Sequence, residues 1–340
     1  MEKIKTAIYF AIIILASSSA LPGAAQNFST MTIVNSSVPG GGTDAQSRLV
    51  TRHLSRYMPG SPNIIVRNMP GAGGLIVASY LYNVAPRDGS TFGLFSDAIA
   101  FAPLVQSTKI DFEPQKFFWI GSLTSYTPLF FVRSDSRIKK FGQVLKEEVT
   151  VGASGAGSVS SVYPTVLNKL INSKFKVING YRGSANINLA IERGEVEGYA
   201  AWCWSCIKIN KPDWVTGKQI SIILQLSFDG DPELNSQGIQ TLADFIDSPG
   251  DRRIANIVFG GSAMARPFAL PPGVPETTAL AIRSAFEKMA FDTEFLEDAK
   301  KMGEEINFVT SNKIRQIIDD AYSADAHDLA RLRSMIETEK

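Results

Sequence analysis

The chain has 340 residues, with 34 basic and 33 acidic side chains and a formal net charge of +1. Such a balance provides no basic field, so we exclude nucleic acid as a partner and expect any anion recognition to be local. His53 and His327 lack zinc-site spacing with the two cysteines, and we predict no metal and no cofactor.

Residues 1–25 have the pattern of an export signal. Lys3 and Lys5 precede an apolar stretch, residues 7–16, that is too short to span a bilayer as a stable helix. Small residues then end at Ala25, where we expect cleavage. The pattern predicts a periplasmic protein, and an uncleaved anchor is the alternative.

A glycine loop joins the first predicted strand, residues 32–35, to a helix over 45–57. Backbone N–H groups at the positive end of a helix bind anions, and glycine allows close approach. Asp44 is expected either to hold this loop through backbone N–H groups or to meet a ligand ammonium or hydroxyl. A tight connection without a ligand is the alternative. The predicted ligand contacts in this loop are Gly40, Gly41, Gly42, Thr43 and Asp44.

Further strands at 63–67 and 91–95, with a helix at 75–84 between them, complete a βαβαβ run. This order predicts a parallel sheet with helices on its faces. Ser96 and Asp97 follow the third strand and are predicted to point toward a ligand cleft.

A second strand–loop–helix unit begins at 149–152 and leads into a helix at 159–171, after two apolar segments at 117–123 and 129–133. We expect its loop to hold the other end of the ligand, although some of its serines, such as Ser160 and Ser161, are suitable as helix caps alone. The predicted contacts here are Ser154, Gly155, Ala156, Gly157 and Ser158.

A third loop lies between a strand at 175–178 and a helix at 185–193. Its Arg182 could pair bidentately with a carboxylate or lie free on the surface, and Ser184 is the expected helix cap. The predicted contacts in this loop are Tyr181, Arg182, Gly183 and Ser184.

An aromatic segment with both cysteines follows a short strand at 195–201. Trp202 and Trp204 either wall the pocket against an apolar ligand body or pack in the core, and Trp204 is included among the predicted contacts. Cys203 and Cys206 could form a disulfide, act as a thiol redox pair or stay as buried thiols.

The rest of the chain predicts two lobes. We expect a central strand at 220–226, extended segments at 257–259 and 266–269, and helices at 276–290, 293–302 and 311–337. Because the helical end has no strands of its own, we expect it to cover the first lobe. The predicted domains are residues 26–126 plus 257–340 for lobe 1, and 127–256 for lobe 2. A ligand cleft would lie between these two αβ domains.

Six motifs in order resemble one family, the extracytoplasmic solute receptors of tripartite tricarboxylate transporters, also called the Bug family. Among them are residues 39–44, 68–74, 181–184 and 266–275. The resemblance covers essentially the whole chain after residue 26 and implies a two-lobed, type II periplasmic binding protein. It also implies a monomer that closes on a small carboxylate and delivers it to membrane permease subunits. The Cys-containing segment at 202–206 departs from the usual pattern.

No catalytic residues are predicted. A Gly-x-Ser-x-Gly elbow and a His-Glu-x-x-His pair are both missing from the sequence, so a binding protein is favoured over an exported hydrolase that would use His53. A sensory receptor that presents its ligand to a membrane kinase would use the same clamp, and a thiol oxidoreductase is the most distant alternative.

Overall fold

The computed structural model describes residues 27–105, 109–155 and 158–336. The predicted export signal and the predicted contacts Ala156 and Gly157 lie outside these segments. Within them, no helix is both long and apolar enough to cross a membrane.

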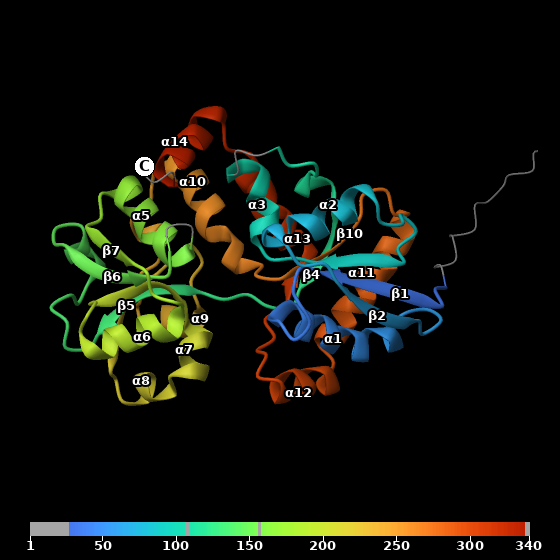
Figure 1. Cartoon of the computed structure of the whole chain (residues 1–340), viewed down its shortest axis with the longest axis horizontal. Coiled ribbons are helices and arrows are strands. Elements are labelled where there is room, and N and C mark those ends of the chain that lie inside the picture. Colours follow the sequence, from blue (N-terminus) through green and yellow to red (C-terminus); the bar gives the residue numbers. More distant parts are fainter. Residues whose placement is uncertain (1–26, 106–108, 156–157, 337–340) are drawn as a thin grey trace, which may run out of the picture.

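Lobe 1 is built on a six-stranded sheet in the order β11-β4-β10-β3-β1-β2 (Figure 1). β1 pairs in parallel with β2 and β3, as the βαβαβ pattern predicted, whereas β10 runs antiparallel between β3 and β4. The strands are β1 (Thr30–Asn35), β2 (Asn63–Asn68), β3 (Thr91–Leu94), β4 (Phe118–Ser122), β10 (Pro267–Leu270) and β11 (Val309–Thr310).

Lobe 2 is built on a five-stranded sheet in the order β7-β6-β8-β5-β9. Here β5, the strand by which the chain enters the lobe, runs antiparallel between β8 and β9. The strands are β5 (Pro128–Arg133), β6 (Val149–Ala153), β7 (Phe175–Asn179), β8 (Gly198–Cys203) and β9 (Ile220–Gln225). β9 is an edge strand, so our prediction of a central strand at 220–226 was wrong. Because helices cover both faces of the sheet, side chains on both sides of β9 are shielded from water, so this edge strand is as apolar as a central one.

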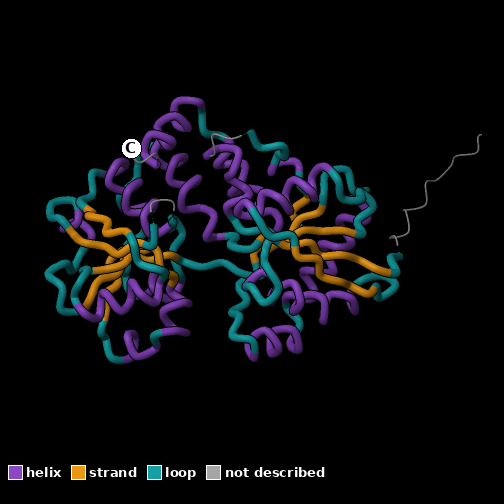
Figure 2. The backbone as a smooth tube through the Cα atoms, in the orientation of Figure 1, coloured by secondary structure: helices purple, strands orange, loops and turns teal. Residues whose placement is uncertain are grey.

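The two sheets thus repeat one plan, with helices on the faces of each (Figure 2). In both, the strand that follows a crossing between lobes, β10 or β5, lies fourth when counted from β2 or from β7 and opposes the parallel strands. This confirms the predicted two-lobed α/β fold. The helices that carry the site are α1 (Gly42–Leu54), α3 (Ala98–Val105), α5 (Val159–Ile171), α6 (Ser184–Arg193) and α7 (Trp204–Asn210). The others are α2 (Leu75–Asn83), α4 (Phe141–Val144), α8 (Pro212–Thr216), α9 (Pro232–Ser236), α10 (Pro249–Phe259), α11 (Glu276–Ala290), α12 (Thr293–Lys301), α13 (Ser311–Tyr322) and α14 (Ala326–Ile336).

Helices α10 and α14 connect the lobes along one side of the molecule (Figure 1). Residues 257–259 are the last turn of α10, not an extended segment, and Ser248 Oγ caps the helix by accepting the Asp251 N–H. α14 packs against α5 and α10 as well as α3, so the end of the chain does not cover lobe 1 alone. We therefore propose to place the second domain boundary after α10, at 260–266, because residue 256 lies inside that helix.

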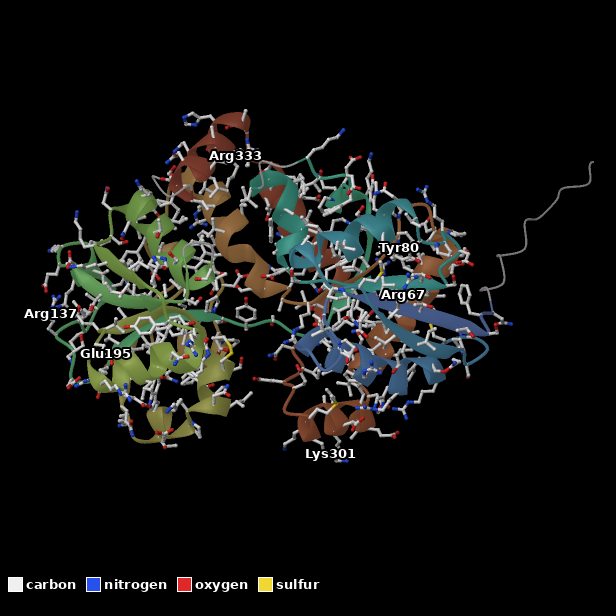
Figure 3. The ribbon with its side chains drawn as sticks, viewed as in Figure 1. Arg67, Tyr80, Arg137, Glu195, Lys301 and Arg333 are labelled. Atoms are coloured by element: carbon white, nitrogen blue, oxygen red, sulfur yellow. A yellow bond between two sulfur atoms is a disulfide. The ribbon has the colours of Figure 1, made fainter. Side chains whose placement is uncertain are left out.

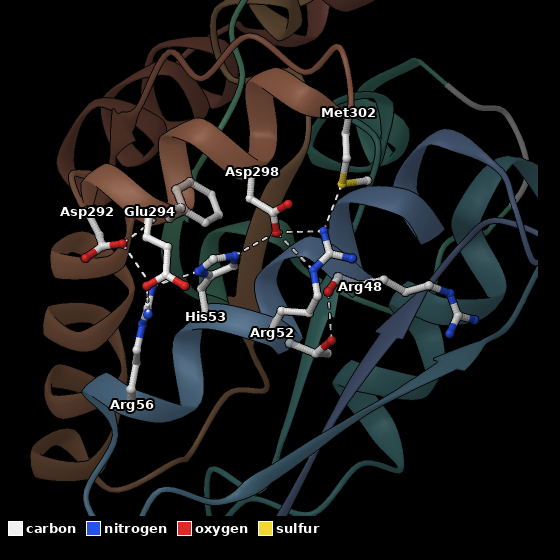
Figure 4. Close-up of polar contacts among 10 residues, drawn as sticks. Arg48, Arg52, His53, Arg56, Asp292, Glu294, Asp298 and Met302 are labelled. Atoms are coloured by element: carbon white, nitrogen blue, oxygen red, sulfur yellow. Dashed lines mark hydrogen bonds and ion pairs between the residues drawn. The ribbon is translucent and has the colours of Figure 1, made fainter.

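A polar seam joins α12 to α1 in lobe 1 (Figure 4). His53 Nε2 lies 2.9 Å from Asp298 Oδ2, and Arg56 Nη2 donates to Asp292 Oδ1 over the same distance. The hydrogen bond from His53 is the main cause that lowers the pKa of Asp298. This seam fixes α12 antiparallel along α1, and it carries the following residues, including Glu304, toward the start of α1.

Candidate functional site

A cavity of about 580 Å³ lies between the lobes. Its size is that of a typical small-molecule site. The carboxyl ends of β1, β3, β6 and β8 face it, as expected for ligand sites in α/β sheets. Its main lining residues are Thr43, Ser96, Asp97, Tyr126, Arg266, Glu304 and Glu305 on the lobe 1 and hinge side, and Val159, Ser184, Tyr199, Trp202, Cys203, Cys206 and Ile209 on the lobe 2 side.

Asp44 holds the first glycine loop from beneath. Its Oδ2 accepts hydrogen bonds from the Gly40 N–H (2.8 Å) and from Arg48 Nε (2.9 Å), while Asn68 Nδ2 donates to Oδ1 (2.9 Å). The hydrogen bond from Arg48 is the main cause that lowers the pKa of Asp44 to about 2. Asp44 is only 2% exposed, so it takes the loop-holding role of our two alternatives, and its oxygens are engaged inside the protein.

The start of α1 offers free donors next to a cation. No side chain caps this helix, and the N–H groups of Gly42 and Thr43 meet no acceptor among the described residues. The guanidinium of Arg266 lies beside Gly42, because a Cβ added at Gly42 would be 3.0 Å from Arg266 Nη2. Arg266 Nη1 lies 3.3 Å from both oxygens of Glu304, which leaves Nη2 without a hydrogen-bond partner within the described segments. Two peptide N–H groups and Nη2 can therefore bind one carboxylate.

Asp97 supplies a carboxyl group on the same side of the cavity. It follows β3, and its backbone N–H donates to the carbonyl of Ala265 (3.0 Å). A Cβ at Gly261 would lie 2.5 Å from Oδ2, so the carboxyl group is enclosed by the hinge on one side and open to the cavity on the other. Desolvation by this burial raises the pKa of Asp97 to about 6. Ser96 and Asp97 thus line the cleft where the sequence placed them.

The lobe 2 wall is mainly apolar. Val159 and Ile209 are 51% and 56% exposed although both line the cavity. Beside them the rings of Tyr199 and Trp202 are nearly parallel, at 14°. Cys203 and Cys206 form a disulfide in this wall, so they are not the two buried thiols that were one of our alternatives. Tyr199 Oη is 3.1 Å from Ser184 Oγ.

The loop before α5 uses its serines internally. Ser158 Oγ donates to the carbonyl of Gly155 (2.7 Å), and the Ser154 N–H donates to Ser160 Oγ (3.1 Å). Trp204 Nε1 donates to Glu233 Oε2 (2.8 Å), and its side chain lines a smaller adjoining cavity. Of the described contacts predicted in lobe 2, Ser184 lines the main cleft, and the following do not: Ser154, Gly155, Ser158, Tyr181, Arg182, Gly183 and Trp204. Of the contacts predicted in lobe 1, Thr43, Ser96 and Asp97 line it, and the following do not: Gly40, Gly41, Gly42 and Asp44.

Sequence reasoning missed Arg266 and Tyr126 as site residues. Each stands just before an antiparallel strand, β10 or β5, that is inserted among parallel ones. The start of such a strand lies at the same sheet edge as the ends of its parallel neighbours, which brings both residues to the cleft. The two predicted crossings between the lobes lie close to both residues in the sequence. Placing the residues at the cleft also required the directions of β10 and β5, which the sequence patterns did not give.

Charged groups outside the cleft have structural roles. His53 is 4% exposed within the α1–α12 seam and does not line the interlobe cavity. Asp325, His327 and Asp328 place ligand atoms within 4.8 Å of one another, yet Asp328 Oδ2 already accepts Arg253 Nε (2.6 Å). Arg137 and Glu195 lie on the side of lobe 2 turned away from lobe 1 (Figure 3).

No family model matches this chain. It is 32% identical over 132 residues to the "UPF0065 protein in gbd 5'region" of Cupriavidus necator, and the match spans 38% of each chain. Its fold is similar to that of a TctC solute-binding protein from Polaromonas, with a TM-score of 0.70, 18% identity and coverage of 90% of this chain and 97% of the other.

Two further solved structures share the fold at lower similarity. A protein from R. palustris with adipate has a TM-score of 0.56 and 17% identity, covering 90% of this chain and 97% of its own. MatC from Rhodopseudomonas palustris with bound malate has a TM-score of 0.53 and 18% identity, covering 91% and 99%. Fold and local sequence therefore agree with the resemblance indicated by the motifs: the chain has the fold of TctC solute-binding proteins and is similar in sequence to a UPF0065 protein.

Proposed function

We propose that this chain is a periplasmic solute receptor of the TctC and Bug type, without catalytic activity. It captures a small carboxylate between its lobes and delivers it to the membrane subunits of a tripartite transporter. The observation that carries the proposal is the position of Arg266, whose guanidinium lies against the uncapped start of α1 inside the interlobe cavity.

The ligand carboxylate would accept hydrogen bonds from the Gly42 and Thr43 N–H groups and from Arg266 Nη2. Hydrogen bonds to charged groups contribute about 1.5–3 kcal/mol each. A ligand held there also meets the lobe 2 wall when the lobes approach, so its contacts favour the closed form over the open form. That closed form is the state that a membrane partner can distinguish from the empty receptor.

The solved structures that share this fold support the proposal, because two of them hold the carboxylates adipate and malate. Export by residues 1–25 and cleavage near Ala25 belong to the same proposal. A periplasmic location would give the receptor access to solutes before they cross the inner membrane.

Thermal unfolding with a panel of acids tests ligand capture. A ligand that binds only the folded state raises the melting temperature as its concentration exceeds Kd. We expect at least one carboxylate at millimolar concentration to raise it, and the matching amide to leave it unchanged. If no mono-, di- or tricarboxylate raises the melting temperature, the receptor function is wrong.

Delivery is tested separately. Membrane vesicles that contain the candidate permease subunits should take up the bound acid only when the exported receptor is added. Uptake at the same rate without the receptor would contradict the transport role while leaving carboxylate binding intact.

A further inference from the structure

The two walls of the cleft differ in chemistry, and this difference names a ligand class. We infer that the ligand is a monocarboxylate with a compact apolar body, for which an aromatic ring is the best fit. Its carboxylate binds at Arg266 on lobe 1, and its ring packs on the lobe 2 wall. The inference rests on the proposed receptor function and narrows it.

The charges of the cleft provide for one ligand carboxylate. Arg266 is the single Lys or Arg among the described lining residues, whereas Asp97, Glu304 and Glu305 bring three carboxyl groups. Glu304 already pairs with Arg266. A second carboxylate on the ligand would reach a wall without a cation, where desolvation of a charge is unfavourable. The charges therefore select against di- and tricarboxylates.

The lobe 2 wall presents partly exposed apolar side chains to the cavity. Val159 and Ile209 are each more than half exposed. Val159 begins α5 and Ile209 lies near the end of α7, and both helices border the cavity. Exposed apolar side chains gathered in a cleft mark a binding surface. A ligand with an apolar body would cover them when the lobes close.

The same wall has features that suit a ring. Tyr199 and Trp202 lie with centroids 6.4 Å apart and line the cavity next to the disulfide of Cys203 and Cys206. Aromatic edges and sulfur atoms both make favourable contacts with an aromatic ring. Ser184, Ser205 and Asn210 add uncharged polar groups that could orient a ring substituent.

Calorimetric titration with benzoate, cyclohexanecarboxylate, acetate, adipate and citrate tests the inference on the full exported chain. We expect benzoate to bind at least tenfold more tightly than adipate or citrate, with cyclohexanecarboxylate between benzoate and acetate. If adipate or citrate binds more tightly than benzoate, the ligand class is wrong and the receptor function stands. If none of the five binds, the receptor function itself fails.

Ile209→Ser provides the second test, with Leu189→Ser as its matched control. Leu189 is an exposed apolar residue of α6 that does not line the cavity, so both variants remove a partly exposed aliphatic group from lobe 2. We expect Ile209→Ser to weaken benzoate about fivefold and leave acetate unchanged, and Leu189→Ser to alter neither. Equal benzoate affinity in the wild type and Ile209→Ser, with both folded by circular dichroism, would overturn the assignment of the ring to this wall.

Discussion

The sheets of lobe 1 and lobe 2 share the arrangement of five strands, to which lobe 1 adds β11 at one edge, yet the lobes present opposite chemistry to the cleft. The lobe 1 side has an uncapped helix start, one guanidinium and three carboxyl groups, whereas the lobe 2 side has aliphatic and aromatic side chains and a disulfide. Loops at equivalent positions in the two lobes therefore need not make the same contacts with a ligand. The fold decides where a ligand lies, and the side chains at the sheet edges decide which end of it each lobe holds.

The largest expected effect follows from removing the cation on lobe 1. Arg266→Gln should weaken benzoate roughly 30-fold, because a charge-assisted hydrogen bond is lost and Glu304 is left unpaired beside the ligand. Arg182→Gln is the control on lobe 2, where this arginine is exposed and forms no ion pair with the described residues. Titration calorimetry should show less than a twofold change for it. A larger loss of benzoate affinity in Arg182→Gln than in Arg266→Gln would mean that lobe 2, and not lobe 1, holds the carboxylate.

A pair of glycine substitutions compares the two loops directly. A methyl group at Gly42 would press on Arg266 Nη2, at 3.0 Å, whereas a methyl group at Gly155 meets none of the described residues within 4 Å. We expect Gly42→Ala to weaken benzoate about fivefold by displacing the guanidinium, and Gly155→Ala to change it less than twofold. Equal losses in titrations of both variants would mean that both loops hold the ligand.

The carboxyl group of Asp97 should make binding depend on pH. Its pKa is raised to about 6, so it is neutral at pH 5.5 and negative at pH 7.5. Benzoate stays ionised across this range, and we expect it to bind about threefold more tightly at pH 5.5, since one pKa unit corresponds to about 1.4 kcal/mol. Titrations of Asp97→Asn should show no such change. Tyr126 and Tyr163 also interact electrostatically with Asp97, but desolvation raises the pKa of both hydroxyl groups, so they stay protonated in this range.

The raised pKa of Asp97 also predicts that the free energy of unfolding depends on pH. Because the folded-state pKa of Asp97 lies above its ordinary value of 3.8, its contribution favours the folded protein below that value and is lost as pH rises through about 6. The free energy of unfolding should therefore fall between pH 4 and pH 6 more steeply in the wild type than in Asp97→Asn. Parallel curves from urea titrations would contradict the assignment.

The smallest effect on binding is expected at the disulfide. Cys203 and Cys206 are three positions apart, so opening the bond frees a short loop and lowers the free energy of unfolding by about 1–2 kcal/mol. Replacing both with serine keeps the size of the wall, and benzoate affinity should change less than threefold. A complete loss of binding with an intact fold would make the disulfide a primary contact and not part of an apolar surface.

Sequence patterns located much of this fold. The glycine loop before α1, the βαβαβ run and the helix at 159–171 were correctly placed, because each combines a clear period with a local start or stop signal. Residues 257–259 were misread as extended because three apolar residues in a row fit a short strand as well as the last turn of α10. The edge position of β9 could not be read from its composition.

The candidate site was only half predictable. Thr43, Ser96 and Asp97 follow parallel strands or their loops, so the topology placed them. Arg266 depended on the direction of β10, which no local pattern reveals. The serines before α5 had the right composition for an anion site, but their hydroxyl groups satisfy the loop itself. Trp204 was expected at the cleft, yet its indole is bonded to Glu233.

The position of the ligand carboxylate in a crystal structure tests the central claim most directly. With the tightest-binding acid of the five titrated, we expect its oxygens within hydrogen-bonding distance of the Thr43 N–H and Arg266 Nη2, and its body against Ile209. A carboxylate found beside residues 155–158 or Arg182, with Arg266 still free, would contradict the account.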